Sequence, residues 1–385
     1  MNAQVSPSAL ITEQPAKIFY IDNLKVILII LVVLHHTFIT YGAPGSWYYM
    51  QKTTQQGALI PMTLFVAVNQ SFFMGFFFFL SAYFVRPSYQ KKGASHFLKD
   101  RLIRLGIPLL FYSFIFSPVL NYIVYYFGKG HHITFMQFLG GYDDWVDFGV
   151  LWFVAALLLF TLLYVGWRKI TTSREAEIKP ALSVGKVLLI ATRIGVITFL
   201  VRLVFPVGWV LNPLGFQLGH FTQYIALFIG GILASKYHCL ENITYIQGKI
   251  AVRIAGLLIA IIFPLFYVLL TTLKFPSSWF SGGFHGSALL YAMWEQLTGL
   301  CIIMALLGIG REKLNKNSAL WSKLSRCAFA VYIFHPLVVV SVALILSSWT
   351  IDPAIKLLVA APLVVVGSFL LGSAILLIPG VKRII

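Results

Sequence analysis

Long apolar runs separated by short polar segments dominate the chain from about residue 22 onward. A helix that crosses a bilayer needs about 20 consecutive apolar residues, whereas a strand of a membrane barrel needs about ten that alternate with polar ones. Because the runs here are unbroken, they predict helices. We expect ten spans, at residues 22–41, 62–86, 102–127, 149–167, 187–205, 217–235, 250–273, 288–310, 326–346 and 353–380.

The pattern therefore predicts an all-α polytopic integral membrane protein with about ten transmembrane helices. The composition agrees, since 59% of the 385 residues are hydrophobic and only 11% are charged. A soluble globular protein carries about 25% charged residues, so the soluble and disordered classes are excluded. The three cysteines are far apart and indicate neither a disulfide framework nor a zinc site.

The basic residues predict the orientation. Cytoplasmic loops of membrane proteins gather Lys and Arg, and an even number of spans puts both termini on one side. If both termini are cytoplasmic, the inner segments hold 23 of the 29 basic residues and the outer loops hold four. We therefore expect an N-in, C-in topology. The same asymmetry accounts for the net charge of +17, so nucleic acid is not an expected partner.

The domain organisation follows from the spans. Residues 1–17 are mostly polar and predict a cytoplasmic N-terminal tail, with no cleavable signal peptide. Residues 18–385 predict a single transmembrane domain that lies in the cell membrane, with the lipid bilayer as its surroundings. The sequence shows no P-loop, dinucleotide-binding glycine motif or HExxH pair.

The first span carries the sharpest chemical signal, because ionisable residues at membrane depth are costly and are functional candidates by default. Lys25 and His36 are eleven residues apart, which places both on one helix face, about 16 Å apart along the axis. An imidazole titrates near neutrality and suits proton abstraction from a hydroxyl. The structural alternative is a histidine that joins two helices, with Lys25 reaching the interface.

Two later spans carry further candidates. His335 precedes Pro336, which disturbs a helix locally. Glu295 is a lone membrane carboxylate that could partner His36, His335 or Arg202, or could simply join two helices. The remaining histidines of the outer segments, His131, His132, His220 and His285, show no metal-ligand spacing. We interpret them as surface or loop residues, and no metal is expected.

A basic segment precedes the third span. It contains six basic residues between Arg86 and Arg104, and Arg101 and Arg104 are neighbours on a helix face. Guanidinium groups suit phosphate oxygens such as those of coenzyme A. The alternatives are ordinary topological charge and contact with anionic lipids. The outer loops are rich in aromatic residues, which include Trp47 and Tyr48. These residues could form an interfacial aromatic belt, or they could stack on the sugar rings of a substrate.

Several segments together are similar to a known family. They are YIDNLKVILIILVVLHH, FFMGFFFFLSAYF, FLKDRLIRLGIP, VLWFVAALLLF, QYIALFIGGILAS and VYIFHP. In this order and spacing the chain resembles the membrane acyltransferase 3 family, and within it the glucan biosynthesis protein C type. The resemblance implies transfer of an acyl group, acetyl or succinyl, from cytoplasmic acyl-CoA to a hydroxyl of an extracytoplasmic glycan or similar acceptor, in a bacterial plasma membrane.

The resemblance also implies a site. His36 takes the place of the first-span histidine, His335 that of the late histidine, and Arg101 and Arg104 that of the family's RxxR. Lys25 stands where the family usually has arginine, Ala82 where it has glycine, and Val150 where it often has histidine. We expect His36 to act as general base, alone or relayed by Glu295 or His335. The donor phosphates are expected near Lys25, Arg86, Arg101 and Arg104.

Two other functions fit the residues. In a proton-coupled transporter or flippase, the same histidines and Glu295 would form a proton relay, and the basic segment would only set the topology. In a protein that binds a lipid or peptidoglycan precursor without catalysis, the ligand would be held and no acyl donor would be consumed.

Overall fold

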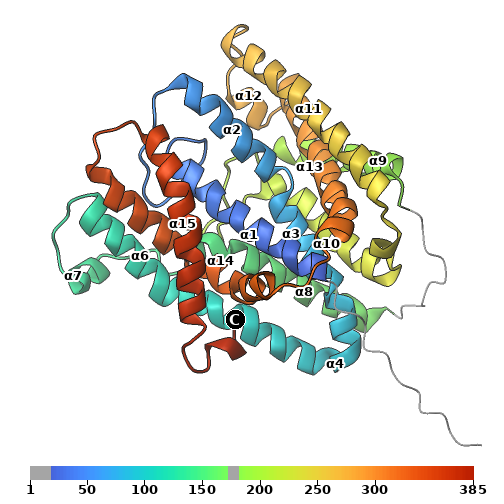
Figure 1. Cartoon of the computed structure of the whole chain (residues 1–385), viewed down its shortest axis with the longest axis horizontal. Helices are drawn as coiled ribbons and strands as arrows, with labels where there is room; N and C mark the ends of the chain where they lie inside the picture. The colour runs from blue at the N-terminus through green and yellow to red at the C-terminus, as the bar shows by residue number, and fades with distance from the viewer. Residues whose placement is uncertain (1–18, 172–181) are drawn as a thin grey trace, which may run out of the picture.

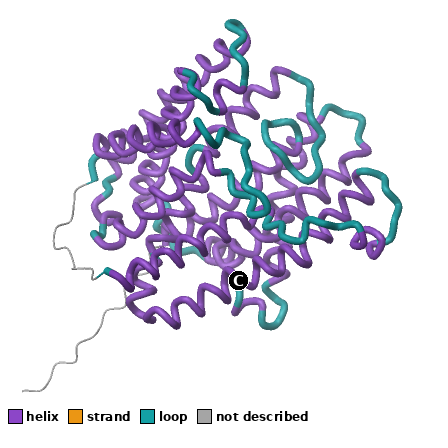
Figure 2. Tube along the Cα trace, turned by 180° about the vertical axis from the view of Figure 1, so that it is seen from behind, coloured by secondary structure: helices purple, strands orange, loops and turns teal. Residues whose placement is uncertain are grey.

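The structure is a computed structural model that describes residues 19–171 and 182–385, so the predicted tail at residues 1–17 lies outside the described residues. Within these two ranges the chain is helix joined by loops, without a strand (Figure 2). One isolated antiparallel bridge pairs Leu211 with Phe216. The expectation of an all-helical chain is confirmed.

In the described part of the chain, ten helices are long and apolar enough to cross a bilayer, and they match the ten predicted spans. They are α1 (Phe19–Thr40), α2 (Gln56–Gln70) continued by α3 (Phe73–Tyr83), α4 (Val85–Arg101) continued by α5 (Ile107–Phe111) and α6 (Ser117–Ile123), α8 (Trp152–Ile170), α9 (Val184–Arg202), α10 (Phe221–Lys236), α11 (Tyr245–Thr271), α13 (Gly286–Lys313), α14 (Ala319–Ile345) and α15 (Pro353–Ile375). Two short helices, α7 (Phe135–Gly140) and α12 (Ser278–Ser281), lie in loops.

Helix α1 crosses the middle of the molecule (Figure 1). It packs against α14 and α15 on one side and against α2, α3 and α13 on the other. Helices α9, α11 and α13 form a second group, and α3 pairs closely with α10. The first span therefore contacts five other helices, which gives its polar side chains partners from distant parts of the chain.

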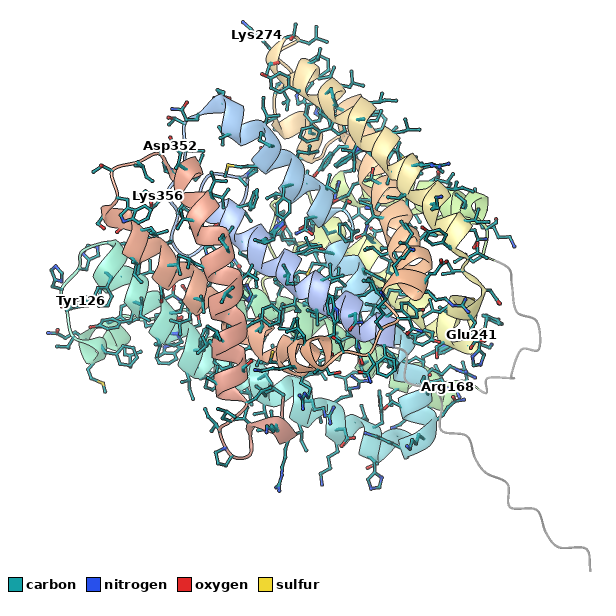
Figure 3. All side chains as sticks on the ribbon, in the orientation of Figure 1. Tyr126, Arg168, Glu241, Lys274, Asp352 and Lys356 are labelled. Atoms are coloured by element: carbon teal, nitrogen blue, oxygen red, sulfur yellow. The ribbon has the colours of Figure 1, made fainter. Side chains whose placement is uncertain are left out.

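The two ends of the helix bundle differ. We name one end the cavity face, after a cavity that is described in the next subsection, and it carries the loops at residues 41–55, 129–148, 203–217, 272–285 and 349–352. We name the other end the basic face, and it carries the loops at residues 237–244 and 314–318 and the C-terminal residues 376–385. Figure 3 shows Tyr126, Lys274 and Asp352 towards one end and Arg168 and Glu241 at the other. The assignment of the basic face to the cytoplasm stays a prediction.

Two spans depart from regular α-helix. The second breaks at Ser71 and Phe72, between α2 and α3. The third contains π-helical turns at Leu102–Gly106, Tyr112–Phe116 and Val124–Gly128. Such turns occur often at functional sites. Here Ser117 follows the second π-turn, and its hydroxyl donates to Asp147 Oδ2 at 2.6 Å, which fixes the loop before α8 to the third span.

Small residues set how closely the helices approach. Gly299 of α13 lies against the backbone carbonyl of Ser71 at the helix break. Gly248 of α11 lies in the same way against the backbone of α13 at Gly308 and Ile309. Glycine at a membrane helix interface removes the side chain that would keep two backbones apart. The position of the break in the second span therefore depends on Gly299.

We predict that Gly299→Ala lowers the thermal stability of the purified protein in detergent, because the added Cβ would collide with the Ser71 carbonyl. Overpacking of this kind costs about 1–3 kcal/mol. The matched control is Gly256→Ala, since Gly256 lies within α11 and a Cβ added there would meet nothing within 4 Å. An unchanged melting temperature for Gly299→Ala would show that the two backbones are not held in contact.

Candidate functional site

A cavity of about 1090 Å³ opens on the cavity face and reaches to the middle of the bundle. Its walls come from α1, α2, α3, α10 and α11 and from the loops of the cavity face. Most of the lining is apolar or aromatic, and a few polar groups interrupt it. These polar side chains include His35, His36, Gln56, Gln70, Asp147, Gln217 and His220. The cavity has the size and character of a small-molecule site.

His36 lies in this cavity and is joined to His335. The Nδ1 atom of His36 and the Nε2 atom of His335 are 2.9 Å apart, and the two rings are parallel within 11°. His335 is fully buried, whereas His36 is partly accessible. The structure thus brings together two of the histidines that the sequence indicates, from spans that are 299 residues apart.

The partners of His335 decide which nitrogen of His36 is free to act. A carbonyl only accepts, so His335 Nδ1, which lies 2.9 Å from the Tyr332 carbonyl, is the donor of that hydrogen bond. In a pair of neutral imidazoles, His335 Nε2 then accepts from His36 Nδ1, and His36 Nε2 keeps its lone pair. This assignment of tautomers gives His36 the form that a general base requires.

The loop at residues 41–55 covers the histidine pair. Trp47 stacks on His36, with ring centroids 4.0 Å apart and planes inclined by 15°. The next part of the loop is tied to α14 and α15, because Gln51 Nε2 donates to the Ala343 carbonyl at 2.8 Å and Lys356 Nζ donates to Gln51 Oε1 at 2.8 Å. Thr53 donates to Asp352 Oδ1 at 2.7 Å. The loop therefore holds an indole ring over the imidazole from a fixed position.

His35 belongs to a different set of contacts. It is buried, its Nδ1 lies 3.3 Å from Asn69 Nδ2, and its ring packs on Phe73 at 4.9 Å. Asn69 also donates to the Leu31 carbonyl at 3.1 Å. These contacts join α1 to the second span on both sides of its break. His35 thus positions the helices, while its neighbour His36 faces the second histidine.

Glu295 does not hydrogen-bond with either His36 or His335. Its Oε2 accepts from Arg202 Nη2 at 2.6 Å, and its Oε1 lies 3.1 Å from His220 Nδ1. All three side chains are buried. The sequence allows three partners for Glu295, and in the structure Glu295 pairs with one of them, Arg202. In this geometry Glu295 therefore cannot relay a proton directly to His36.

The ion pair continues into a chain of amide side chains. Gln296 Nε2 donates to Glu295 Oε2 at 3.2 Å, and Gln223 Nε2 donates both to Gln296 Oε1 at 2.8 Å and to the Ser71 carbonyl at 2.7 Å. The Ser71 carbonyl lies at the helix break, where regular helical hydrogen bonds end. Because an unsatisfied carbonyl inside a membrane is costly, this network stabilises the break.

The predicted donor-binding residues lie on or near the basic face. Lys25 pairs with Asp22 at 3.4 Å, with its ammonium 4.8 Å from the centre of the Phe84 ring. Arg101 packs over Phe97, with 5.1 Å between guanidinium and ring, and both Arg86 and Arg101 are half-buried, whereas Arg104 is exposed. None of these four basic residues lines the cavity that contains His36. The structure therefore separates the cationic candidates from the histidine pair.

Comparison with known proteins places this arrangement in a family. A family model described as acyltransferase domain matches residues 18–374, nearly the whole chain. The chain belongs to the acyltransferase 3 family. Two relatives, each called glucans biosynthesis protein C, from Salmonella typhi and from Salmonella typhimurium, are 25% identical to it over 226 residues.

These alignments cover 56% of this chain and 58% of each relative, so the chain spans less than two thirds of the curated relatives that it matches. No solved structure matches the chain. The resemblance predicted from the sequence, to the acyltransferase 3 family and to the glucan biosynthesis protein C type, is confirmed.

Two departures from the family pattern lie at contacts between helices in this acyltransferase 3 protein. Ala82, at the usual glycine position of α3, faces Gly231 of α10, where a Cβ would lie 2.8 Å from the Cβ of Ala82. Gly231 therefore leaves room for the methyl group of Ala82. Val150, at the position that often holds histidine, contributes its backbone carbonyl, which accepts a hydrogen bond from the Tyr332 hydroxyl. No contact explains why Lys25 replaces arginine.

Sequence reasoning misses two residues of the site. The interpretation of His220 as a surface or loop residue is wrong, since it is buried beside Arg202 and Glu295 and borders the cavity. Trp47 belongs to the aromatic outer loops, but its sequence position gives no link to His36. A signal for His220 is its position directly before the apolar run of α10, where a helix end places a side chain inside the bundle.

We predict that Glu295→Ala destabilises the protein more than the double substitution Arg202→Leu with Glu295→Leu. The single substitution leaves the Arg202 guanidinium buried without its counter-charge, which costs about 3–5 kcal/mol, whereas removing both charges avoids that cost. Thermal unfolding in detergent measures the order. If the double variant is the less stable of the two, the charges of this pair do not determine the stability of the bundle.

Proposed function

We propose that the protein is a membrane O-acyltransferase that moves an acetyl or succinyl group from acyl-CoA to a hydroxyl of a glycan or similar acceptor. The observation that carries the proposal is the hydrogen-bonded His36–His335 pair, of which His36 lines the cavity, in a chain of the acyltransferase 3 family. The 25% identical relatives named for glucan biosynthesis support a sugar polymer as the acceptor.

His36 would act as the general base. Its Nε2 takes the proton of the acceptor hydroxyl as the oxygen attacks the thioester carbonyl, the C–S bond breaks, and the proton passes to the coenzyme A sulfur. His335 stabilises the charged imidazole, because its Nε2 accepts from His36 Nδ1 at 2.9 Å. Trp47 restricts the rotation of the ring and shields it from water. Glu295 would not relay protons directly to His36. Together with Arg202, it would instead hold the break between α2 and α3 in position.

The donor would approach from the basic face. Lys25, Arg86, Arg101 and Arg104 supply positive charge there, and the phosphates of acyl-CoA carry the opposite charge. The acceptor would enter through the mouth of the cavity on the other face. The two substrates then meet near His36 without sharing one aqueous compartment, which requires the protein to lie in a bacterial plasma membrane with its basic face in the cytoplasm.

The contacts of Glu295 weigh against a proton-coupled transporter. In such a protein a membrane carboxylate is neutralised by the proton that it carries. Glu295 is neutralised by Arg202 at 2.6 Å and is further held by Gln296 and His220, so its charge has a permanent partner. The family assignment adds support for acyl transfer over transport.

We predict that His36→Ala abolishes acyl transfer while the protein still folds and inserts. Loss of a general base lowers the rate by about 10²–10⁴-fold. Thiol release from acetyl-CoA and succinyl-CoA by purified protein in nanodiscs, with and without a glucan acceptor, measures it. The matched control is His238→Ala, since His238 is exposed on the basic face. Full activity in His36→Ala would remove the proposal, and proton-driven flux without thiol release would replace it with transport.

We predict that His335→Phe lowers kcat with little change in the KM for the donor, since the substitution removes the acceptor for His36 Nδ1 and keeps a ring of similar shape. His335→Gln restores a side chain with both donor and acceptor and is expected to recover part of the rate. Steady-state kinetics of the same thiol-release assay separate the two constants. Equal kcat values for wild type and both variants would assign His335 a purely structural role.

A further inference from the structure

A second, smaller cavity lies on the basic face, between the beginning of α1 and the beginning of α14. Its volume is about 290 Å³, at the lower end of small-ligand sites. It is lined by Phe19, Asp22, Asn23, Lys316, Asn317, Trp321, Ser322, Ser325 and Arg326. None of these residues belongs to the sequence-predicted donor site.

The walls of this cavity are held in place by partly buried hydrogen bonds. Asn23, which is 4% exposed, donates to the carbonyls of Leu314 at 2.7 Å and Lys316 at 3.1 Å. The Tyr20 amide donates to Asn315 Oδ1 at 3.3 Å. The loop at residues 314–318 is therefore fixed to α1, and the cavity has a defined shape.

The lining combines two cations, an aromatic ring and hydroxyl groups. Lys316 and Arg326 supply positive charge, and Arg326 is oriented by a hydrogen bond from its Nε to the Ser322 carbonyl at 3.2 Å. Trp321 offers an indole ring, and Ser325 offers a hydroxyl donor for an anion, whereas the Ser322 hydroxyl donates to Asn317 Oδ1 at 3.3 Å. The first turn of α14 lines the same cavity, so its helix dipole adds to the positive potential. Asp22 also faces this cavity, with its charge paired with Lys25 at 3.4 Å.

An aromatic face beside cations and hydroxyls suits a nucleotide, whose base stacks and whose phosphate needs charged donors. The position along the helices adds a second argument. Asp22 and His36 are 14 residues apart on α1, about 21 Å along its axis, and Ser322 and His335 are 13 residues apart on α14, about 20 Å. The same two helices thus carry this cavity at one end and the histidine pair further along.

We propose that this cavity binds the adenosine 3′-phosphate end of the acyl-CoA donor, with Arg326 and Lys316 on the phosphate and Trp321 against the adenine. The inference rests on the proposed acyltransferase function and locates its donor. Coenzyme A carries its thioester on a long flexible arm, so a nucleotide held at this cavity places the acyl group at a distance, in the direction of His36. Arg101 and Arg104 would then contribute to the potential of the basic face without gripping this phosphate.

The test uses the full chain in phosphatidylcholine nanodiscs, which contain no anionic lipid, and measures coenzyme A binding by calorimetry. Arg326→Ala is expected to weaken binding about tenfold or more, since it removes a charged hydrogen-bond donor to phosphate. Lys323→Ala is the matched control, because Lys323 is an exposed cation on the same helix that does not line the cavity. Arg326 is also exposed, so both variants are expected to fold.

A second ligand tests whether Arg326 binds the 3′-phosphate of coenzyme A. 3′-Dephospho-coenzyme A should bind wild type more weakly than coenzyme A does, and Arg326→Ala should bind both ligands equally. If Arg326→Ala and Lys323→Ala bind coenzyme A like wild type while Arg101→Ala does not, the location proposed here is wrong and the acyltransferase function stands. If wild type neither binds coenzyme A nor releases thiol from its acyl esters, the proposed function itself fails.

Discussion

The ion pair between Arg202 and Glu295 is the interaction on which the middle of this protein depends. Two opposite charges 2.6 Å apart can be buried in a bilayer because each removes the cost of the other. Through Gln296 and Gln223 the pair also provides a donor for the Ser71 carbonyl, so the second span can break without leaving a polar group unsatisfied. The break places Gln70 in the cavity and Phe73 against His35. This polar network thus holds in place a part of the wall of the cavity that His36 also lines.

Most of the fold can be predicted from the sequence, because the bilayer imposes a length and an apolar character on each span. The ten predicted spans correspond to the ten long helices, with differences at their ends. The sequence does not reveal the break at Ser71 and Phe72, since neither residue is glycine or proline. The π-helical turns of the third span do have such a signal, because Gly106, Pro108, Pro118 and Gly128 lie in or beside them, but glycine and proline alone do not predict the type of turn. The break of the second span depends on a tertiary contact, that of Gly299 with the Ser71 carbonyl, which hydrophobic periodicity does not report.

Less of the candidate site can be predicted. Helical spacing puts His36 and His35 on different sides of α1, and the contacts of the two residues differ accordingly. Residue types alone leave Glu295 with three possible partners, because choosing among helices that are far apart in the chain requires the packing. His220 and Trp47 resemble residues of the outer segments when judged by their neighbours in the chain. Both enter the bundle because the segments that carry them turn inward, His220 before α10 and Trp47 from a loop held by Gln51 and Thr53.

Helix α11 links the cavity to the thickness of the surrounding bilayer. The apolar part of this helix after Arg253, residues 254–271, extends about 27 Å, close to the hydrocarbon core's thickness of about 30 Å, so a change in bilayer thickness is met by a change in tilt. Its buried residues, Gly248, Ala251, Ala255 and Phe266, lie mostly in its first half, and Pro264 interrupts the second. Phe263, Phe266 and Tyr267 from that second half form part of the cavity wall. A thinner or thicker membrane would therefore change the inclination of this wall. The length of the lipid chains would then influence the width of the cavity that leads to His36.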